Sequence, residues 1–287
     1  MVESTAAAGR VAVDRLRKAL DSARAARACN EEGPPRIEPA GPHVYPRASN
    51  TGSLPAIVYS RTKTFRPSAR LLEQNRVTNP AVEAPAVAAY RMLRTQVLQR
   101  MDARAWRSLA VFSPGAHDGK TTTAINLAVS AASDHSHTVL LVDFDLRRPM
   151  IAATLGLQPQ FGVEDVLMGR ASLEECLYHP EGFERLVVLP ALSATRGSSE
   201  ILAAPRAKEL MVELRSRYPE RIVIFDLPPV LLADDALAVA PRVDCGLVVA
   251  AEGRTRRNDL VRTIELLHQT PLVGTVLNRA ADARSDY

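Results

Sequence analysis

The stretch SPGAHDGKTTT, residues 113–123, decides the fold of this chain. It follows the apolar run Leu109–Phe112 and precedes residues with helical spacing, so it reads as a turn from a buried strand into a helix. In such a turn the backbone N–H groups and the helix N-terminus cradle phosphate, Lys120 reaches the β- and γ-phosphates, and the Thr121 hydroxyl binds Mg²⁺. Pro114 stands where the strict motif has its first glycine, so the strand–turn–helix context carries the prediction.

Two further segments place carboxylates beyond apolar runs. Asp143 and Asp145 follow Val139–Val142, and Asp226 follows Ile222–Phe225. The i, i+2 spacing points the first two carboxylates the same way, so both can face one metal–phosphate centre. The alternative is a loop whose aspartates accept hydrogen bonds from backbone N–H groups. The lysine turn favours the metal site, and together the three segments predict nucleotide chemistry.

Two other positions extend the predicted site. The arginines after Asp145, Arg147 and Arg148, can pair with phosphate or with a neighbouring acidic surface. Asn278 ends the last apolar run, where its amide could bond a base edge, although asparagine at a strand end is commonly a turn residue.

Short apolar runs alternate with helical stretches through most of the chain. The runs lack polar alternation, which is typical of strands covered on both faces, as in a parallel sheet wrapped by helices. They are Leu109–Phe112, Val139–Val142, Leu186–Leu189, Ile222–Phe225, Leu247–Ala251 and Val273–Leu277. We predict a doubly wound α/β fold with a mostly parallel sheet, whose ligands bind beyond the carboxyl ends of the strands.

Composition divides the chain into four parts. Residues 1–28 are expected to form an amphipathic helix, 29–80 a Pro-rich linker and extension, 81–280 the nucleotide-binding domain, and 281–287 a C-terminal tail. Helices are expected over Ala86–Arg104 and near Ser68–Asn75 within these parts. Arginines crowd the first 110 residues, which suits either a solvated arm or contact with acidic lipid or an acidic partner.

Composition also excludes several classes of function. Aromatic residues make up only 5% of the 287 residues, so a base-stacking nucleic-acid surface is not expected. The three cysteines lack CxxC spacing and indicate neither a disulfide framework nor a zinc site. No stretch approaches the ~20 apolar residues of a membrane span, which predicts a cytoplasmic protein that would need another protein to anchor it.

In these motifs the chain resembles the bacterial tyrosine kinases of capsule and exopolysaccharide export. These kinases belong to the P-loop ATPases with Walker A, A′ and B motifs, a group that also includes the ParA/MinD type. The stretch VLLVDFDLRRP at 139–149 carries most of the resemblance. Matching pieces are GKTTTAINLA at 119–128, IVIFDLPPVLLADDALAVAPRVDCGLVV at 222–249, and LVGTVLN at 272–278. The opening helix also resembles the leader of kinases from exosortase-linked polysaccharide loci.

The resemblance implies ATP and Mg²⁺ as cofactors and gives each site residue a role. Lys120, Asp143 and Asp145 would be catalytic, with Asp145 activating the attacking hydroxyl, and Thr121, Asp143 and Asp226 would bind the metal. The nucleotide would contact Gly115, Asp118, Gly119, Lys120, Thr121, Thr122, Arg147 and Asn278. Tyr287 would be the phosphoacceptor in the tail.

The resemblance also implies partners and a location. A membrane-embedded polysaccharide chain-length regulator would activate the kinase and hold it at the inner face of the plasma membrane. Homologous copies would phosphorylate one another in a ring, and a tyrosine phosphatase would reverse the reaction. No nucleic acid is expected.

The sequence departs from the family pattern at four points. His117 stands where the family has glycine, and Ala88 replaces the acidic residue that precedes Arg91 and Arg94 in the family's ring-contact motif. Leu227 replaces a small or hydroxyl residue, and Tyr287 alone stands for a tail of several tyrosines. These departures leave open a nucleotide-switched scaffold with little kinase activity. A ParA/MinD-like positioning ATPase ranks lower, because no lysine lies between Ser113 and Gly119.

Overall fold

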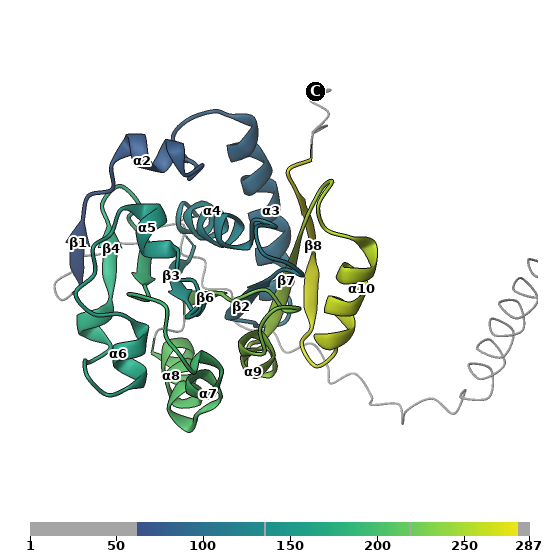
Figure 1. Cartoon of the computed structure of the whole chain (residues 1–287). Coiled ribbons are helices and arrows are strands. Elements are labelled where there is room, and N and C mark those ends of the chain that lie inside the picture. Colours follow the sequence, from purple (N-terminus) through teal and green to yellow (C-terminus); the bar gives the residue numbers. More distant parts are fainter. Residues whose placement is uncertain (1–61, 135, 218–219, 281–287) are drawn as a thin grey trace, which may run out of the picture. The chain divides into compact units, whose positions relative to one another are not determined.

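The predicted nucleotide motifs lie on the central strands of one eight-stranded sheet (Figure 1). The computed structural model describes residues 62–134, 136–217 and 220–280. The strand order is β1-β4-β5-β3-β6-β2-β7-β8, and every neighbouring pair is parallel except β4 with β5. The strands are β1 (Lys63–Phe65), β2 (Ser108–Phe112), β3 (Thr138–Asp143), β4 (Tyr178–Pro180), β5 (Leu186–Leu189), β6 (Arg221–Asp226), β7 (Cys245–Ala251) and β8 (Leu272–Asn278).

Helices cover both faces of this sheet, as Figure 1 shows. They are α2 (Ala69–Gln74), α3 (Pro85–Asp102), α4 (Lys120–Ala132), α5 (Ile151–Leu155), α6 (Val163–Leu167), α7 (Ser198–Ala203), α8 (Pro205–Ser216), α9 (Asp235–Val239) and α10 (Arg257–Leu266). Short 3₁₀ helices span Glu174–Cys176 and Ala240–Arg242.

The central strands are apolar at every position because they feed two cores. In β2, Leu109 and Val111 pack with the α3 and α4 side of the sheet, whereas Ala110 and Phe112 pack with the opposite side. All five residues of β2 are buried. The prediction of a sheet covered on both faces, with a doubly wound α/β fold, is therefore confirmed.

All six predicted strands are present, and the helix predicted over Ala86–Arg104 is α3. Sequence reasoning missed the edge strand β1 and its neighbour β4, which have only three residues each. Lys63–Phe65 carries no apolar run, and its backbone pairing with β4 supplies the structure instead.

The segment expected as linker and extension thus contributes structure to the sheet. Strand β1 and helix α2 lie in the same compact unit as the other described strands and helices. The Asn75 side chain at the end of α2 donates to the carbonyl of Thr154 at 2.8 Å. The helix predicted over residues 1–28, most of the linker and the tail with Tyr287 lie outside the described residues.

Within the described part of the chain, no helix combines the length and the apolar composition that crossing a bilayer requires.

Candidate nucleotide site

The predicted site residues gather where β2, β3 and β6 end side by side. In the register of the sheet, Asp226 pairs with Asp143 on one side and with Val111 on the other. The turn after β2 therefore meets both carboxylate segments at one edge, as expected for a doubly wound sheet. A cavity of about 390 Å³ opens there. It is lined by Ala116, His117, Gly119, Lys120, Thr121, Thr122, Asp145, Arg147, Arg148, Met150, Thr154, Pro228, Pro229, Leu232, Ala233 and Arg279.

Hydrogen bonds within the phosphate turn and from β8 stabilise its conformation. The Gly115 N–H donates to Asp118 Oδ2 at 2.8 Å, which stabilises the turn. Asn278 Nδ2 donates to the carbonyl of Asp118 at 3.0 Å. Asn278 therefore supports the turn in this structure, and its contact with a base edge stays a prediction.

His117 occupies a left-handed backbone conformation, with φ of 64°. The family resemblance has glycine at this position. Glycine adopts a positive φ without steric cost, which explains why a glycine suits this turn. The Arg279 guanidinium donates to the His117 carbonyl at 3.2 Å. This contact fixes the turn in the conformation that the side chain disfavours.

Gly119 caps helix α4 with φ of 96°. A Cβ at this position would lie 1.9 Å from Asn278 Nδ2, so the turn and β8 approach too closely for any side chain. Helix α4 therefore begins without a side-chain cap, and its first residues, Lys120, Thr121 and Thr122, line the cavity. The N–H groups of such an uncapped helix N-terminus suit a phosphate group.

Gly119→Ala should weaken nucleotide binding at least about tenfold, because the left-handed backbone alone costs about 1–2 kcal/mol and Asn278 must also move. Titration with a fluorescent ATP analogue measures the effect. Gly253→Ala is the matched control: Gly253 has φ of 68°, and a Cβ there meets nothing within 4 Å. Equal affinities in the two variants would contradict the close approach of Asn278 as the cause.

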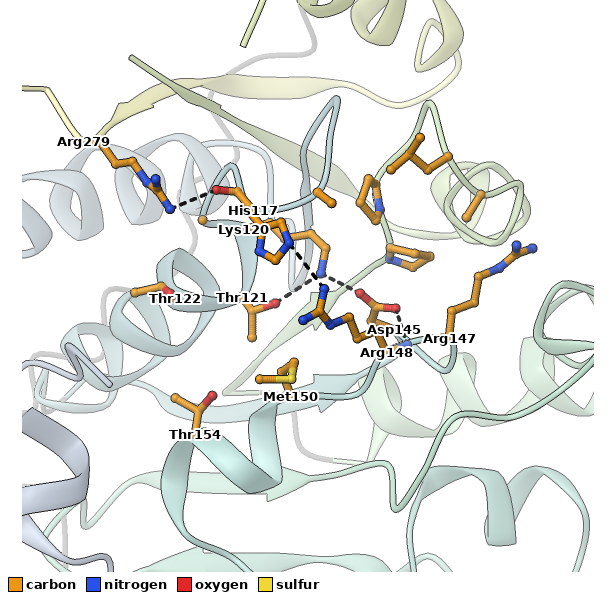
Figure 2. A pocket seen from close by; sticks show the side chains of 16 residues that line it. His117, Lys120, Thr121, Thr122, Asp145, Arg147, Arg148, Met150, Thr154 and Arg279 are labelled. Carbon is orange, nitrogen blue, oxygen red and sulfur yellow. Dashed lines mark hydrogen bonds and ion pairs between the residues drawn. The ribbon is translucent and has the colours of Figure 1, made fainter. Parts of the chain in front are cut away.

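Lys120 lies at the centre of a buried cluster of charges, and Figure 2 shows its contacts with Asp145 and Thr121. Its Nζ is 2.7 Å from Asp145 Oδ2, 3.4 Å from Asp226 Oδ1 and 3.1 Å from Thr121 Oγ1. Burial alone would lower the pKa of Lys120, but the attraction of Asp226 and Asp145 outweighs it and raises that pKa. The lysine is therefore held as a cation.

Thr121 and Asp226 form the second half of this cluster. The Thr121 hydroxyl donates to Asp226 Oδ2 at 2.6 Å. Burial raises the pKa of the Asp226 carboxyl, although Lys120 and the hydrogen bond from Thr121 oppose the rise. A hydroxyl and a carboxylate at this distance are oxygen ligands of the kind that Mg²⁺ prefers.

Asp143 makes contacts different from those of Asp145. Its Oδ1 accepts from the Asp145 N–H at 3.2 Å, and its Oδ2 accepts from the N–H groups of Met150 and Ile151 at 3.1 and 3.0 Å. Burial, followed by repulsion from Asp226, raises the pKa of Asp143 well above its usual range. The structure thus gives Asp143 the loop-closing contacts weighed as the alternative from sequence. Its metal contact stays a prediction.

The donor set fits Mg²⁺ held together with phosphate. Within residues 62–134, 136–217 and 220–280 no cluster of three His, Cys, Asp or Glu side chains forms a protein cage for a metal. Mg²⁺ is usually bound through one or two carboxylates plus substrate phosphates and water, so a cage is not required. Thr121 and Asp226 supply such a pair, and the raised pKa of Asp226 marks a buried carboxylate that an added cation would stabilise.

Arg147 lines the cavity, yet its guanidinium is engaged elsewhere. Nε donates to Asp235 Oδ2 at 2.7 Å, and a terminal nitrogen donates to Asp234 Oδ1 at 2.8 Å. Figure 2 shows this guanidinium turned away from Lys120. The sequence left two roles open for Arg147, pairing with phosphate or with acidic residues. In the structure Arg147 pairs with the acidic residues.

Sequence reasoning missed Arg279 as a residue at the mouth of the cavity, where Arg148 and His117 also lie. Arg148 approaches His117, with 3.4 Å between the guanidinium and Nε2, and Arg279 borders the same space. Adjacency to a predicted site residue was the available signal, because Arg279 follows Asn278. Exposed Leu232 and Met150 add an apolar border that no motif indicated.

Comparisons with known proteins identify the family of the chain. Residues 112–273 match the family model described as AAA domain. Tyrosine-protein kinase YwqD of Bacillus subtilis is 31% identical over 201 residues, which cover 69% of this chain and 83% of the relative. Succinoglycan biosynthesis transport protein ExoP of Rhizobium meliloti is 33% identical over 186 residues, 60% of this chain and 22% of ExoP. Several other tyrosine-protein kinases are likewise much longer, and the chain covers only 26–28% of them.

Solved structures give the same result. The crystal structure of the VpsO kinase domain superposes with a TM-score of 0.61 at 32% identity, over 68% of this chain and 95% of that domain. The septum site-determining protein MinD of Pyrococcus horikoshii, complexed with Mg-ADP, gives a TM-score of 0.51 at 25% identity, over 61% of this chain and 71% of MinD. The family model over more than half of the chain and the identity with tyrosine-protein kinase YwqD place the chain in the bacterial tyrosine kinase family of the AAA-domain P-loop ATPases.

Proposed function

We propose that the chain is an ATP-dependent protein-tyrosine kinase that phosphorylates copies of itself and regulates polysaccharide export. The observation that carries the proposal is the buried cluster in which Lys120 lies between Asp145 and Asp226 while Thr121 bonds Asp226. This cluster stands at a phosphate turn in a member of the tyrosine kinase family. Phosphoryl transfer needs a cation, a metal-binding oxygen pair and a proton acceptor at such a turn.

In the proposed reaction the bare N-terminus of α4 receives the phosphates of ATP. Lys120 then moves its ammonium from Asp145 to the β- and γ-phosphates and neutralises the charge that develops there. Thr121 and Asp226, with Asp143 nearby, would hold Mg²⁺, whose charge would offset that of the phosphates. Gly115, Asp118, Thr122 and Asn278 would shape the cradle around the nucleotide.

The transfer itself requires one proton acceptor. The tyrosine oxygen attacks the γ-phosphorus in line with the departing oxygen of ADP, and the bond from that oxygen to the γ-phosphorus breaks. Asp145, released by Lys120, accepts the phenolic proton. The products are phosphotyrosine and ADP.

Family membership supports the proposed substrate, partners and location. Tyr287, beside Asp286 in the tail, is the proposed phosphoacceptor. A membrane-embedded chain-length regulator would activate the kinase and hold it at the cytoplasmic face of the membrane, copies of the chain would assemble for transfer between subunits, and a tyrosine phosphatase would remove the phosphate. The name of ExoP, a succinoglycan biosynthesis transport protein, supports the link to polysaccharide.

Tyr287→Phe should remove at least about 90% of the phosphotyrosine formed with ATP and Mg²⁺, since the ring is kept and only the accepting oxygen is lost. Immunodetection of phosphotyrosine on the purified chain measures this, with titration of an ATP analogue to establish unchanged binding. Tyr45→Phe is the control, because it removes a tyrosine far from the tail in sequence. Undiminished signal in Tyr287→Phe would move the acceptor to another tyrosine.

A nucleotide-switched scaffold is the second candidate, and one observation favours it. The two arginines of the family's ring-contact motif make contacts within the chain: Arg91 donates to the carbonyl of Pro80 at 2.7 Å, and Arg94 to the carbonyl of Ser130 at 3.2 Å. With Ala88 in place of the acidic residue, the chain lacks the carboxylate that this motif would offer to a second copy. Tight ATP binding without phosphotyrosine, even with the cytoplasmic segment of a chain-length regulator added, would favour the scaffold.

A further inference from the structure

Asp235, the first residue of α9, is a carboxylate with no exposed surface. Its Oδ2 accepts from Arg147 Nε at 2.7 Å, and its Oδ1 is buried without a hydrogen-bond partner. A buried carboxylate is costly unless a cation compensates it, and removing that cation is strongly destabilising. Asp235 and Arg147 therefore form an ion pair in which Arg147 supplies the charge that the buried Asp235 carboxylate requires.

The rest of the Arg147 guanidinium extends this contact across the surface. It donates to Asp234 Oδ1 at 2.8 Å, and Asp234 Oδ2 accepts from the Ser199 hydroxyl at 2.7 Å. The Asp234 side chain is 68% exposed, so its ion pair contributes little. Asp235 therefore contributes more than Asp234 to the free energy that holds the Arg147 guanidinium in place.

The pair acts on the loop that carries Asp145. On one side of Arg147 the Leu146 carbonyl accepts from the Thr195 N–H at 2.7 Å, and further back the Phe144 N–H donates to the Asp226 carbonyl at 2.9 Å. Asp145 Oδ1 accepts from the Arg148 N–H at 3.0 Å, which closes the turn around Arg147. The turn directs Asp145 toward Lys120 and Arg147 away from it (Figure 2). A fixed Arg147 therefore fixes the direction of Asp145.

We propose that Asp235 is a positioning residue of the phosphoryl-transfer site: it holds Arg147 and thereby keeps the loop of residues 144–150 in the conformation that presents Asp145 to Lys120. The proposal rests on the proposed function, in which Asp145 accepts the proton of the acceptor. It also assigns Arg147 to the loop, and leaves Arg148 as the arginine of this motif that faces the cavity near His117.

The test compares Asp235→Asn with the wild-type chain. Asparagine keeps the size and one acceptor but loses the charge, so the loop should loosen while the nucleotide cradle stays intact. We expect kcat for phosphotyrosine formation to fall about 10-fold or more, the usual range for a residue that orients a ligand of the reacting centre. The KM for ATP and the affinity for an ATP analogue should change less than about twofold.

Two comparisons separate positioning from a general structural role. Asp234→Asn removes the exposed partner of Arg147 and should lower kcat much less than Asp235→Asn does. The double variant Arg147→Gln with Asp235→Asn removes both charges, and its kcat should be no lower than that of the worse single variant, because coupled residues do not add. Additive losses would overturn the pairing. The double variant also serves if Asp235→Asn alone fails to fold.

A second readout does not depend on kinase activity. Hydrogen exchange of the amides of residues 144–150 should be faster in Asp235→Asn than in the wild-type chain, with exchange in β2 and β6 unchanged. If the wild-type chain forms no phosphotyrosine even with the cytoplasmic segment of a chain-length regulator added, the proposed function fails, and loop exchange alone then decides the role of Asp235. Unchanged loop exchange, with or without an unchanged kcat, would overturn the positioning role.

Discussion

Lys120→Met is expected to lower phosphotyrosine formation on the order of 10²–10³-fold, the range for removing one preorganised donor from a reacting centre. Lys120 is the described cation that touches both Asp145 and Asp226, and methionine keeps its length without its charge. Transition-state charge on the phosphoryl group would then have no ammonium beside it. The measurement is the initial rate of phosphotyrosine formation at saturating ATP.

The same variant should also lose stability, by about 3 kcal/mol near neutral pH, because it leaves buried carboxylates without their counter-ion. The pKa of Asp226 and that of Asp143 are already raised by burial, so the folded state holds protons there that the unfolded chain releases. Stability from such groups is present at low pH and is lost as the pH rises through the raised folded pKa values. The deficit of Lys120→Met should therefore grow between about pH 4, the ordinary carboxyl pKa, and neutrality.

Urea unfolding at several pH values measures that deficit. Lys208→Met is the matched control, because Lys208 lies exposed on α8 and has the same substitution. It should leave both the kinase rate and the free energy of unfolding nearly unchanged. A pH-independent deficit in Lys120→Met would contradict the role of the raised carboxyl pKa values.

Thr121→Val is expected to raise the Mg²⁺ concentration for half-maximal activity about 10–100-fold, the usual cost of losing a group that orients a metal ligand. Valine fills the same volume but removes the hydroxyl that donates to Asp226 Oδ2 at 2.6 Å. Asp226 would lose both a hydrogen bond and its proposed companion ligand. The rate should therefore fall most at low Mg²⁺.

Titration of the kinase rate with Mg²⁺ at fixed ATP measures this effect. Thr121→Ser restores the hydroxyl and should recover most of the wild-type Mg²⁺ dependence, which separates the role of the oxygen from that of packing. A Thr121→Val chain with wild-type Mg²⁺ dependence would exclude this hydroxyl from the metal site.

The strands that carry the site could be predicted because their sequence signal is local. Leu109–Phe112, Val139–Val142 and Ile222–Phe225 are unbroken apolar runs, and burial on both faces of a sheet requires that pattern. Asp143 and Asp226 directly follow the last two runs, and the turn that leads to Lys120 follows the first. The order of the strands brings these segments together, since β3, β6 and β2 are neighbours.

The contacts of Arg147 and Asn278 could not be predicted, because their partners are distant in sequence. Arg147 meets Asp235 across 88 positions, and Asn278 meets Asp118 across 160. Residue type indicated that each side chain would find a partner, but only the folded sheet determines which one. The short edge strand Lys63–Phe65 escaped for a similar reason, as its pairing with Tyr178–Pro180 comes from backbone geometry.

The central pairing of β2 with β6 has a consequence for how this chain acquires activity. Ser108 pairs with Val223, so the middle of the sheet joins segments separated by more than a hundred residues. Non-local pairings of this kind form slowly, because the entropy cost of closing a long loop comes before the stabilising contacts form. Helices α3 and α4 can form early during refolding, yet neither completes the Lys120–Asp226 cluster. Recovery of ATP-analogue binding should therefore lag behind the recovery of helical circular dichroism, and would report on completion of the sheet.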